Sequence, residues 1–222
     1  PRSCLGKNVT FKDNSTIGGA SLTRWDWNFG DGATQTVTED SVTHTYTRDG
    51  QYDVSLTVTD QNGCSDRTIH YGAASVFSAK ADFSTPDNPT CPGSPVQWEN
   101  GSEGDQLSYE WDFGDHTTSA GINPVKSYEN EGTYSVSLKV KTIIGCEDSV
   151  SKENYIRVAE PRAKWEYSDN NVTCPPFIIS VKNLSENYSR IVWDFGDGSG
   201  SENTQGVSHV YTMGGTYKLR ML

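Results

Sequence analysis

One six-residue stretch occurs three times in this chain, and its spacing constrains the fold more than any other feature. The copies occupy residues 27–32, 111–116 and 193–198, and all three share the pattern Trp-x-Phe-Gly-Asp. Their first residues lie 111 − 27 = 84 and 193 − 111 = 82 positions apart. A period of this length exceeds that of helical or leucine-rich solenoids and fits one small domain per repeat. The 222 residues therefore predict three small domains.

Each copy predicts a core strand that runs into a tight turn. The Trp and the Phe stand two positions apart, so in a strand both side chains point to the same face. The Gly and Asp that follow favour a turn, because glycine tolerates a positive φ and aspartate bonds nearby backbone amides. The residues predicted to form the core between two sheets are Trp27, Trp111, Trp193, Tyr46, Tyr128 and Tyr211.

The rest of the chain predicts short strands and contains no convincing helix. Aromatic and β-branched residues alternate between turns rich in Gly, Asn, Asp and Pro. This pattern indicates all-β sandwiches. We expect domains at residues 1–78, 79–160 and 161–222. The first begins three residues before Cys4 and the third stops before a second cysteine, so we expect both to be truncated.

Charge and hydrophobicity exclude several classes of partner. The formal net charge is −11, whereas nucleic acids and anionic membrane surfaces attract basic proteins. No apolar run approaches the roughly 20 residues that a membrane-spanning helix needs. We therefore expect no nucleic-acid binding and no membrane insertion.

The five cysteines follow the repeat. Cys4, Cys91 and Cys174 occupy one repeat position, which we call position one, and Cys64 and Cys146 occupy a later one, position two. We expect pairing within repeats, Cys4 with Cys64 and Cys91 with Cys146, which would stabilise each domain by roughly 4 kcal/mol in the chain-entropy model. Cys174 then has no partner among these residues. Clustered CxxC-type metal ligands are absent, and disulfides imply an oxidising compartment outside the cytoplasm.

Several motifs together carry a family resemblance. The Trp-Asp-Phe-Gly-Asp-Gly pattern is followed by His-x-Tyr, then Gly-x-Tyr, then an alternating Val-x-Leu-x-Val strand, as at residues 44–46, 50–52 and 54–58. The chain resembles the PKD domain (polycystic kidney disease repeat) three times over nearly its whole length. Departures are Asn28 in the first copy, and His116 and Lys126 in the second.

This resemblance implies an immunoglobulin-like β-sandwich found in extracellular proteins, where it acts as a spacer, stalk or interaction unit. The repeat that carries a cysteine pair and ends in Asn-Gly-Cys-x-Asp, at residues 62–66, resembles tandem modules in very large adhesins of gliding bacteria. Such adhesins are exported by a type IX secretion system.

Candidate sites for chemistry have simpler structural interpretations. Asp-Phe-Gly at 112–114 and 194–196 lacks the glycine-rich and catalytic loops of a kinase. The histidines lack a nucleophile elbow, so we interpret them as sheet or turn residues. Oxygen ligands suit calcium, and the candidate ligands are Asp26, Asp31, Asp194 and Asp197, although we favour a turn role for these aspartates. We expect no catalytic residue and no other cofactor.

Two functions remain in competition. We expect a non-catalytic extracellular stalk or spacer of a large cell-surface adhesin, whose partners are protein or carbohydrate on surfaces, or another subunit of a surface assembly. The alternative is an accessory carbohydrate- or protein-binding array of a secreted hydrolase. An array of that kind predicts exposed aromatic side chains. Trp25, Trp98 and Trp165 are not shared between repeats and are the candidates, although we favour a packing role for them.

Overall fold

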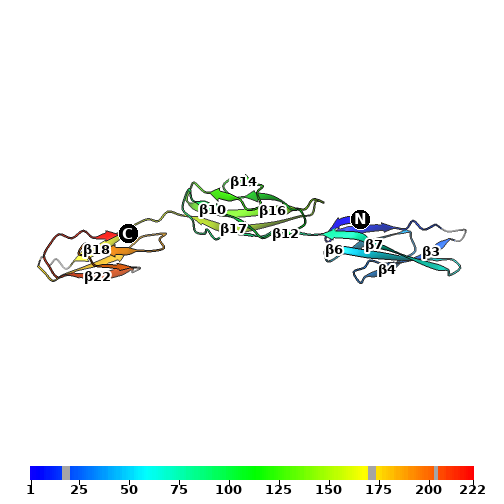
Figure 1. Ribbon diagram of the computed structural model, residues 1–222, viewed down its shortest axis with the longest axis horizontal. Coiled ribbons are helices and arrows are strands. Elements are labelled where there is room, and N and C mark those ends of the chain that lie inside the picture. Colours follow the sequence, from blue (N-terminus) through cyan, green and yellow to red (C-terminus); the bar gives the residue numbers. More distant parts are fainter. Residues whose placement is uncertain (17–20, 170–173, 203–204) are drawn as a thin grey trace. The chain divides into compact units, whose positions relative to one another are not determined.

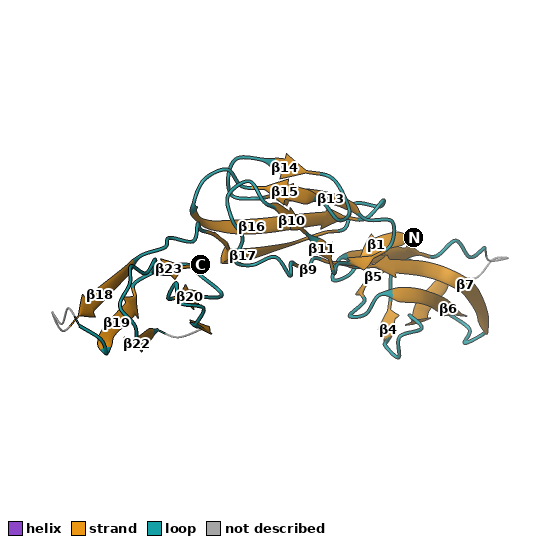
Figure 2. Ribbon diagram, turned by 60° about the vertical axis from the view of Figure 1, so that its left-hand side comes forward, coloured by secondary structure: helices purple, strands orange, loops and turns teal. Residues whose placement is uncertain are grey.

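The computed structural model describes residues 1–16, 21–169, 174–202 and 205–222. Every regular element assigned within these ranges is a β-strand (Figures 1 and 2). Within the same ranges, no helix is long and apolar enough to cross a bilayer. The all-β prediction is confirmed. We refer to residues 1–78, 79–160 and 161–222 as the first, second and third repeats.

By compactness the described chain divides into two units. Unit one comprises Pro1–Asn88, Pro95–Lys126 and Thr133–Ile156, and unit two comprises Pro89–Ser94, Ser127–Gly132 and Arg157–Leu222. Unit one thus holds the first repeat and most of the second. Unit two holds the third repeat together with three short segments of the second, at residues 89–94, 127–132 and 157–160. The division therefore does not follow the sequence repeats.

The first repeat is a sandwich of a five-stranded and a two-stranded sheet. Strand β1 (Arg2–Cys4) runs parallel to β7 (Ser65–Phe77), and the other strand pairings described in this repeat are antiparallel. Alternation explains the packing: along β2 every second side chain is buried, as a strand with one face on a core requires. The larger sheet has the order β1 (Arg2–Cys4), β7 (Ser65–Phe77), β6 (Gly50–Asp60), β3 (Leu22–Asn28) and β4 (Thr34–Val37), and the smaller one pairs β2 (Asn8–Lys12) with β5 (Ser41–Thr45).

The second repeat has the same core with additional short strands. Trp111 on β13 lies opposite Leu138 on β16, and both side chains are fully buried. One sheet has the order β14 (Thr118–Ser119), β13 (Ser108–Asp112), β16 (Gly132–Lys141) and β17 (Glu147–Val158). The two-stranded sheets pair β10 (Pro95–Gln97) with β15 (Val125–Ser127), β11 (Glu99–Asn100) with β9 (Phe83–Ser84), and β12 (Glu103–Gly104) with β8 (Ala79–Lys80).

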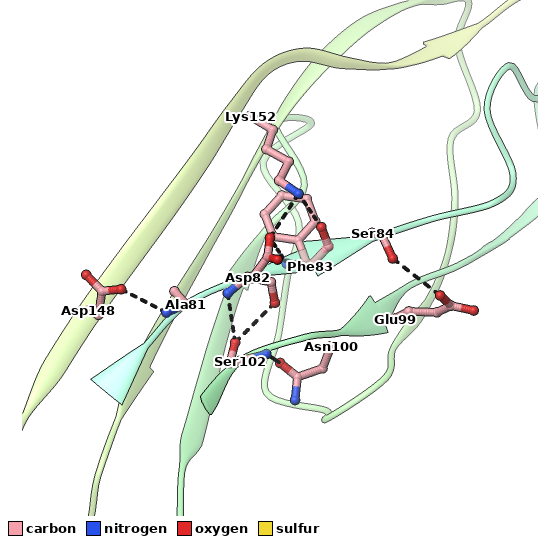
Figure 3. Close-up of polar contacts among 9 residues, drawn as sticks. All are labelled: Ala81, Asp82, Phe83, Ser84, Glu99, Asn100, Ser102, Asp148 and Lys152. Atoms are coloured by element: carbon pink, nitrogen blue, oxygen red, sulfur yellow. Dashed lines mark hydrogen bonds and ion pairs between the residues drawn. The ribbon is translucent and has the colours of Figure 1, made fainter. Parts of the chain in front are cut away.

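Polar contacts fix the opening strands of the second repeat (Figure 3). The Lys152 ammonium lies 4.6 Å from the centre of the Phe83 ring, donates to the Phe83 carbonyl and pairs with Asp82 at 3.1 Å. The Ala81 amide donates to Asp148 at 2.8 Å. Phe83 itself is buried against Trp98 and Trp111. One aromatic side chain thus anchors a segment that has few strand hydrogen bonds of its own.

The third repeat has two three-stranded sheets around a smaller core. The buried cluster contains Ile179, Val181, Ile191, Trp193 and Phe195, together with Tyr211. One sheet has the order β18 (Trp165–Asp169), β19 (Phe177–Asn183) and β22 (Gly206–Tyr211). The other has the order β21 (Gly200–Glu202), β20 (Val192–Asp194) and β23 (Arg220–Met221).

The first glycine of each repeated turn lies directly against the backbone of a neighbouring segment. A Cβ at Gly30, Gly114 or Gly196 would lie 2.3, 2.2 or 2.6 Å from the carbonyl oxygen of Asp53, Ser135 or Lys218, respectively. All three glycines also have φ between +77° and +82°. Glycine therefore serves two purposes here, a left-handed backbone and a close approach to the neighbouring backbone.

Gly30→Ala should destabilise the first repeat by about 3 kcal/mol or more, because the new methyl group forces the turn away from β6 in addition to straining φ. Gly32→Ala is the matched control: two residues away, it has φ +96° and no atom within 4 Å of an added Cβ. It should cost only the backbone strain, about 1–2 kcal/mol. Denaturant unfolding of both variants measures the difference, and equal losses would show that the close approach does not matter.

Candidate functional site

A disulfide joins the first repeat to the second. Cys4 is bonded to Cys146, with Cα atoms 5.4 Å apart and a sequence separation of 142 residues. Cys64, Cys91 and Cys174 are free and exposed. The expected pairing of Cys4 with Cys64 and of Cys91 with Cys146 is therefore wrong.

The geometry of the first sheet explains this correction. Cys4 lies opposite Phe77, the last residue of β7, whereas Cys64 immediately precedes Ser65, the first residue of the same strand. A strand of 13 residues spans about 40 Å at roughly 3.3 Å per residue. Disulfide-bonded cysteines have Cα atoms less than about 7 Å apart. The two cysteines of this repeat thus stand at opposite ends of one strand and cannot bond. Cys91 is the repeat counterpart of Cys4, so the same argument applies to it.

The hydrogen bonds around the cysteines repeat as faithfully as the sequence does. At position two, Asp60 N donates to Cys64 O at 2.9 Å and Thr142 N donates to Cys146 O at 2.8 Å. The cysteine amide in turn is bound by the side chain of Asp60 or Thr142. At position one, Lys7 N donates to Cys4 O at 3.0 Å, and Ser94 N donates to Cys91 O at 3.1 Å. Cys64 and Cys91 therefore stand on the same backbone turns as their bonded counterparts, Cys146 and Cys4.

Polar contacts also hold the segments that lead from one repeat to the next. In unit one, the Ser78 hydroxyl donates to Asp49 at 2.5 Å. In unit two, Glu131 accepts from the Glu160 amide at 2.9 Å and pairs with Arg162 at 2.5 Å. Asp49 and Glu131 both precede the glycine of a Gly-x-Tyr motif. In both repeats, therefore, the residue before this glycine binds the segment that leads to the next repeat.

The aspartate of each repeated turn pairs with a cationic or titratable side chain. Asp31 contacts His44 at 2.7 Å, Asp115 contacts Lys126 at 2.7 Å, and Asp197 contacts His209 at 2.8 Å. In the first and third repeats the histidine ring also stacks on the motif Phe, with ring centres 4.0 and 4.2 Å apart. Sequence reasoning missed this pair, although a detectable signal existed: the position of His44 holds a basic side chain in all three repeats.

These contacts shift the pKa of the carboxyl groups. Burial raises the pKa of Asp31 and of Asp115, but hydrogen bonds outweigh it and both pKa values lie below the ordinary value. The hydroxyl and amide of Ser199 lower the pKa of Asp197 to about 2. Burial raises the pKa of Tyr46 to about 12, so its hydroxyl stays protonated and donates to the Phe29 carbonyl at 3.1 Å. The arrangement fixes the turn.

The four candidate calcium ligands are all engaged by protein donors. Asp26 accepts from Arg24 at 2.8 Å and from Thr36 at 2.5 Å, and Asp194 accepts from the Gly196 amide at 2.9 Å. Asp31 and Asp197 are the turn aspartates that pair with histidine. Among the described residues no three His, Cys, Asp or Glu side chains converge as a metal site requires. The structure thus uses these oxygens for turns and strand pairing.

Asp115→Asn should destabilise the second repeat by about 1 kcal/mol at neutral pH, because Lys126 loses its charged partner in a site where both side chains are less than a fifth exposed. The pKa of Asp115 is depressed by folding. Its contribution is therefore present above the unfolded pKa of about 4 and is lost as the pH falls through the folded value. The wild type and the variant should converge in acid.

The control for this prediction is Glu103→Gln, which breaks an ion pair with Lys80 at 3.6 Å between side chains that are about 70% exposed. Its effect should stay within about 0.5 kcal/mol. Thermal unfolding of both variants across pH 2–7 makes the comparison. A difference between Asp115→Asn and wild type that does not depend on pH would contradict this account.

The predicted core residues lie where the repeat places them. Trp111, Trp193, Tyr46 and Tyr128 are at most 1% exposed, and Trp27 and Tyr211 are 6% and 5% exposed. The candidate surface tryptophans are not a platform, because Trp25 and Trp98 are buried and Trp165 is half-buried.

Described residues of the first and third repeats line cavities that include aromatic side chains. One of about 530 Å³ in the first repeat is lined by residues that include Phe11 and Trp27, and one of about 570 Å³ in the third repeat is lined by residues that include Trp165 and Phe177.

Comparison with known proteins gives a consistent family match. A family model described as PKD domain matches residues 1–73, 79–158 and 161–222. The microbial collagenase of Vibrio alginolyticus is 40% identical over 67 residues, which are 30% of this chain and 8% of the collagenase. The pre-pro-metalloprotease PrtV of Vibrio cholerae is 34% identical over 91 residues, 41% of this chain and 10% of that protein. The matches thus span a tenth or less of these relatives. The crystal structure of the PKD1 domain from PrtV is 30% identical, covers 37% of this chain and 99% of that domain, and has a TM-score of 0.33.

Proposed function

The chain belongs to the PKD domain family, and from this premise we propose that it is a non-catalytic extracellular spacer whose first two repeats are locked to each other by a disulfide. The Cys4–Cys146 bond carries the proposal. An oxidising environment outside the cytoplasm is where such a bond persists. The aspartate turns and buried tryptophans support the same view, because they stabilise the domains and offer no reactive group.

The disulfide gives tension a short covalent path. A pull on the two ends of the chain passes directly from Cys4 to Cys146, so the 146 − 4 − 1 = 141 residues between them lie outside that path. Each residue of the loop could otherwise add at most about 3.6 Å to the extended length, so the disulfide prevents roughly 500 Å of lengthening. A spacer built this way keeps its length even when the domains inside the loop unfold.

Single-molecule pulling on residues 1 and 222 tests this function. The oxidised chain should lengthen only by the unfolding of residues outside the loop. Adding a reductant, or replacing Cys4 and Cys146 with serine, should release about 500 Å more. Cys91→Ser is the matched control and should behave like the wild type, because Cys91 is free. An oxidised wild-type chain that extends by the full length would refute the spacer proposal.

We further propose that the spacer belongs to a large cell-surface adhesin, with a part in adhesion or gliding motility and export by a type IX system. Support comes from the cysteine-bearing repeat, whose Asn-Gly-Cys-x-Asp ending is similar to modules of such adhesins. The partners are then proteins or carbohydrates on a surface, or another subunit. Loss of surface attachment when the segment is deleted from its parent protein, with export intact, tests this step.

A second candidate is an accessory array of a secreted hydrolase. The relatives favour it, since they are named as a microbial collagenase and a pre-pro-metalloprotease. Binding of the purified chain to collagen or polysaccharide, measured with and without a Tyr71→Ala change, separates the two candidates. Tyr71 is 82% exposed and is the most exposed of the large hydrophobic side chains in the described residues. Specific binding that the change abolishes would favour the array.

A further inference from the structure

The free cysteines occupy the same two repeat positions that Cys4 and Cys146 join. In that bond, the position-one cysteine of one repeat is linked to the position-two cysteine of the repeat that follows it. Cys64 is a position-two cysteine, and Cys91 and Cys174 are position-one cysteines. We propose that Cys64 and Cys174 are disulfide half-sites through which a further PKD domain attaches end to end. This extends the proposed spacer function, and its test has a separate readout.

The turn at Cys64 supports the position-two half-site. Its thiol stands on a turn in which Asp60 repeats each backbone hydrogen bond that Thr142 makes around Cys146, including Gly63 N to Asp60 O at 3.1 Å against Gly145 N to Thr142 O at 2.9 Å. Both cysteine amides are also held by the side chain four residues earlier. Cys146 is bonded in this setting, whereas Cys64 is free and exposed. Cys64 is therefore presented as Cys146 is, toward a position-one cysteine of a preceding domain.

Cys174 is the position-one counterpart for a domain that follows the third repeat, and its thiol is exposed. Cys91 differs, because in unit two its end of the second repeat is already met by the third repeat. Within that unit, Glu131 of the second repeat binds Arg162 of the third, and Arg157 of the second repeat binds Asn187 of the third. The residue suited to Cys91 is a position-two cysteine of the third repeat, and residues 161–222 contain only the position-one Cys174.

The bond forms by ordinary thiol–disulfide exchange. The thiolate of Cys64 attacks a low-molecular-weight disulfide such as oxidised glutathione, so a mixed disulfide forms and one reduced glutathione leaves. The thiolate of Cys174 from another domain then attacks the protein sulfur of the mixed disulfide, and the second glutathione leaves reduced. Two thiol protons and two electrons are thereby transferred, and the oxidant ends as two thiols.

The donor of the partner cysteine can be a second copy of this chain or another PKD domain of the same polypeptide. The 222-residue chain, treated with oxidised glutathione and separated without reductant, tests the first source. We expect linear multimers in which peptide mapping links Cys64 of one copy to Cys174 of the next. Cys64→Ser and Cys174→Ser should each reduce the multimers at least tenfold, and Cys91→Ser should leave them unchanged.

Peptide mapping of unreduced protein from its native source tests the second source. A peptide from outside residues 1–222 that is bonded to Cys64 or Cys174 identifies a further domain of the same polypeptide. Either result supports the half-sites. Free Cys64 and Cys174 in both experiments, or multimers joined equally through Cys91, would overturn the proposal. The pulling experiment on Cys4 and Cys146 is independent of these outcomes, so failure here leaves the spacer function standing.

Discussion

Replacing Trp111 with alanine is expected to destabilise the second repeat by about 3–5 kcal/mol, the range for removal of a large aromatic side chain from a core. Trp111 has no exposed surface. Its ring lies 5.3 Å from Phe83 and 5.9 Å from Trp98 between ring centres, and its indole N–H donates to the Gly121 carbonyl at 2.9 Å. The substitution removes packing on several sides and leaves that carbonyl without its donor.

A loss of this size is a large fraction of the stability of a small domain, which is about 5–15 kcal/mol. Denaturant unfolding, with hydrogen exchange of β13 and β16 to localise the effect, measures it. The control is Ile143→Ala in the same repeat, where the side chain is 71% exposed and the change should stay within about 0.5 kcal/mol. A Trp111→Ala loss below 1 kcal/mol would show that the sandwich core lies elsewhere.

Removing the Cys4–Cys146 bond should cost about 5 kcal/mol in the chain-entropy model, because it closes a loop of 142 residues in the unfolded chain. The double variant Cys4→Ser, Cys146→Ser should unfold at a lower denaturant concentration than the oxidised wild type. Reductant should lower the unfolding midpoint of the wild type to that of the double variant, and it should leave the midpoint of the double variant unchanged. Tryptophan fluorescence under oxidising and reducing conditions reports both transitions.

Two single changes control for effects of the substitution itself. Cys64→Ser and Cys91→Ser alter free, exposed thiols and should shift the midpoint by no more than surface changes do, within about 0.5 kcal/mol. If Cys64→Ser instead destabilised the chain as much as Cys4→Ser, the two residues would act as a bonded pair within the first repeat, which contradicts the structure.

The sequence predicted the parts of this molecule that local pattern determines. Strict alternation identified β6, and the Trp-x-Phe-Gly-Asp stretch located β3, β13 and β20 with their buried tryptophans. The glycine of that stretch was expected for its φ. A Cβ added at Gly30 would also lie 2.3 Å from the carbonyl oxygen of Asp53 on β6. Local pattern could not predict this close approach, because it depends on two strands that are distant in sequence.

Cysteine pairing is the clearest case in which local pattern was insufficient. The two cysteines of each repeat are separated by 60 and 55 residues, and this agreement suggested bonds within repeats. The agreement shows only that the repeats are similar in sequence. The bond depends on which end of β7 each cysteine occupies, and that follows from the pairing of Cys4 with Phe77. Likewise, the Asp31–His44 contact required knowing that β5 ends beside the turn.

Peptide mapping of the unreduced chain shows directly which of the five cysteines are bonded to each other. Proteolysis under conditions that block exchange, followed by mass spectrometry, identifies which cysteine-containing peptides stay linked. We expect one link, between the peptides that contain Cys4 and Cys146, with Cys64 and Cys91 free before oxidation. Links from Cys4 to Cys64 and from Cys91 to Cys146 would contradict it and return the disulfides to single domains.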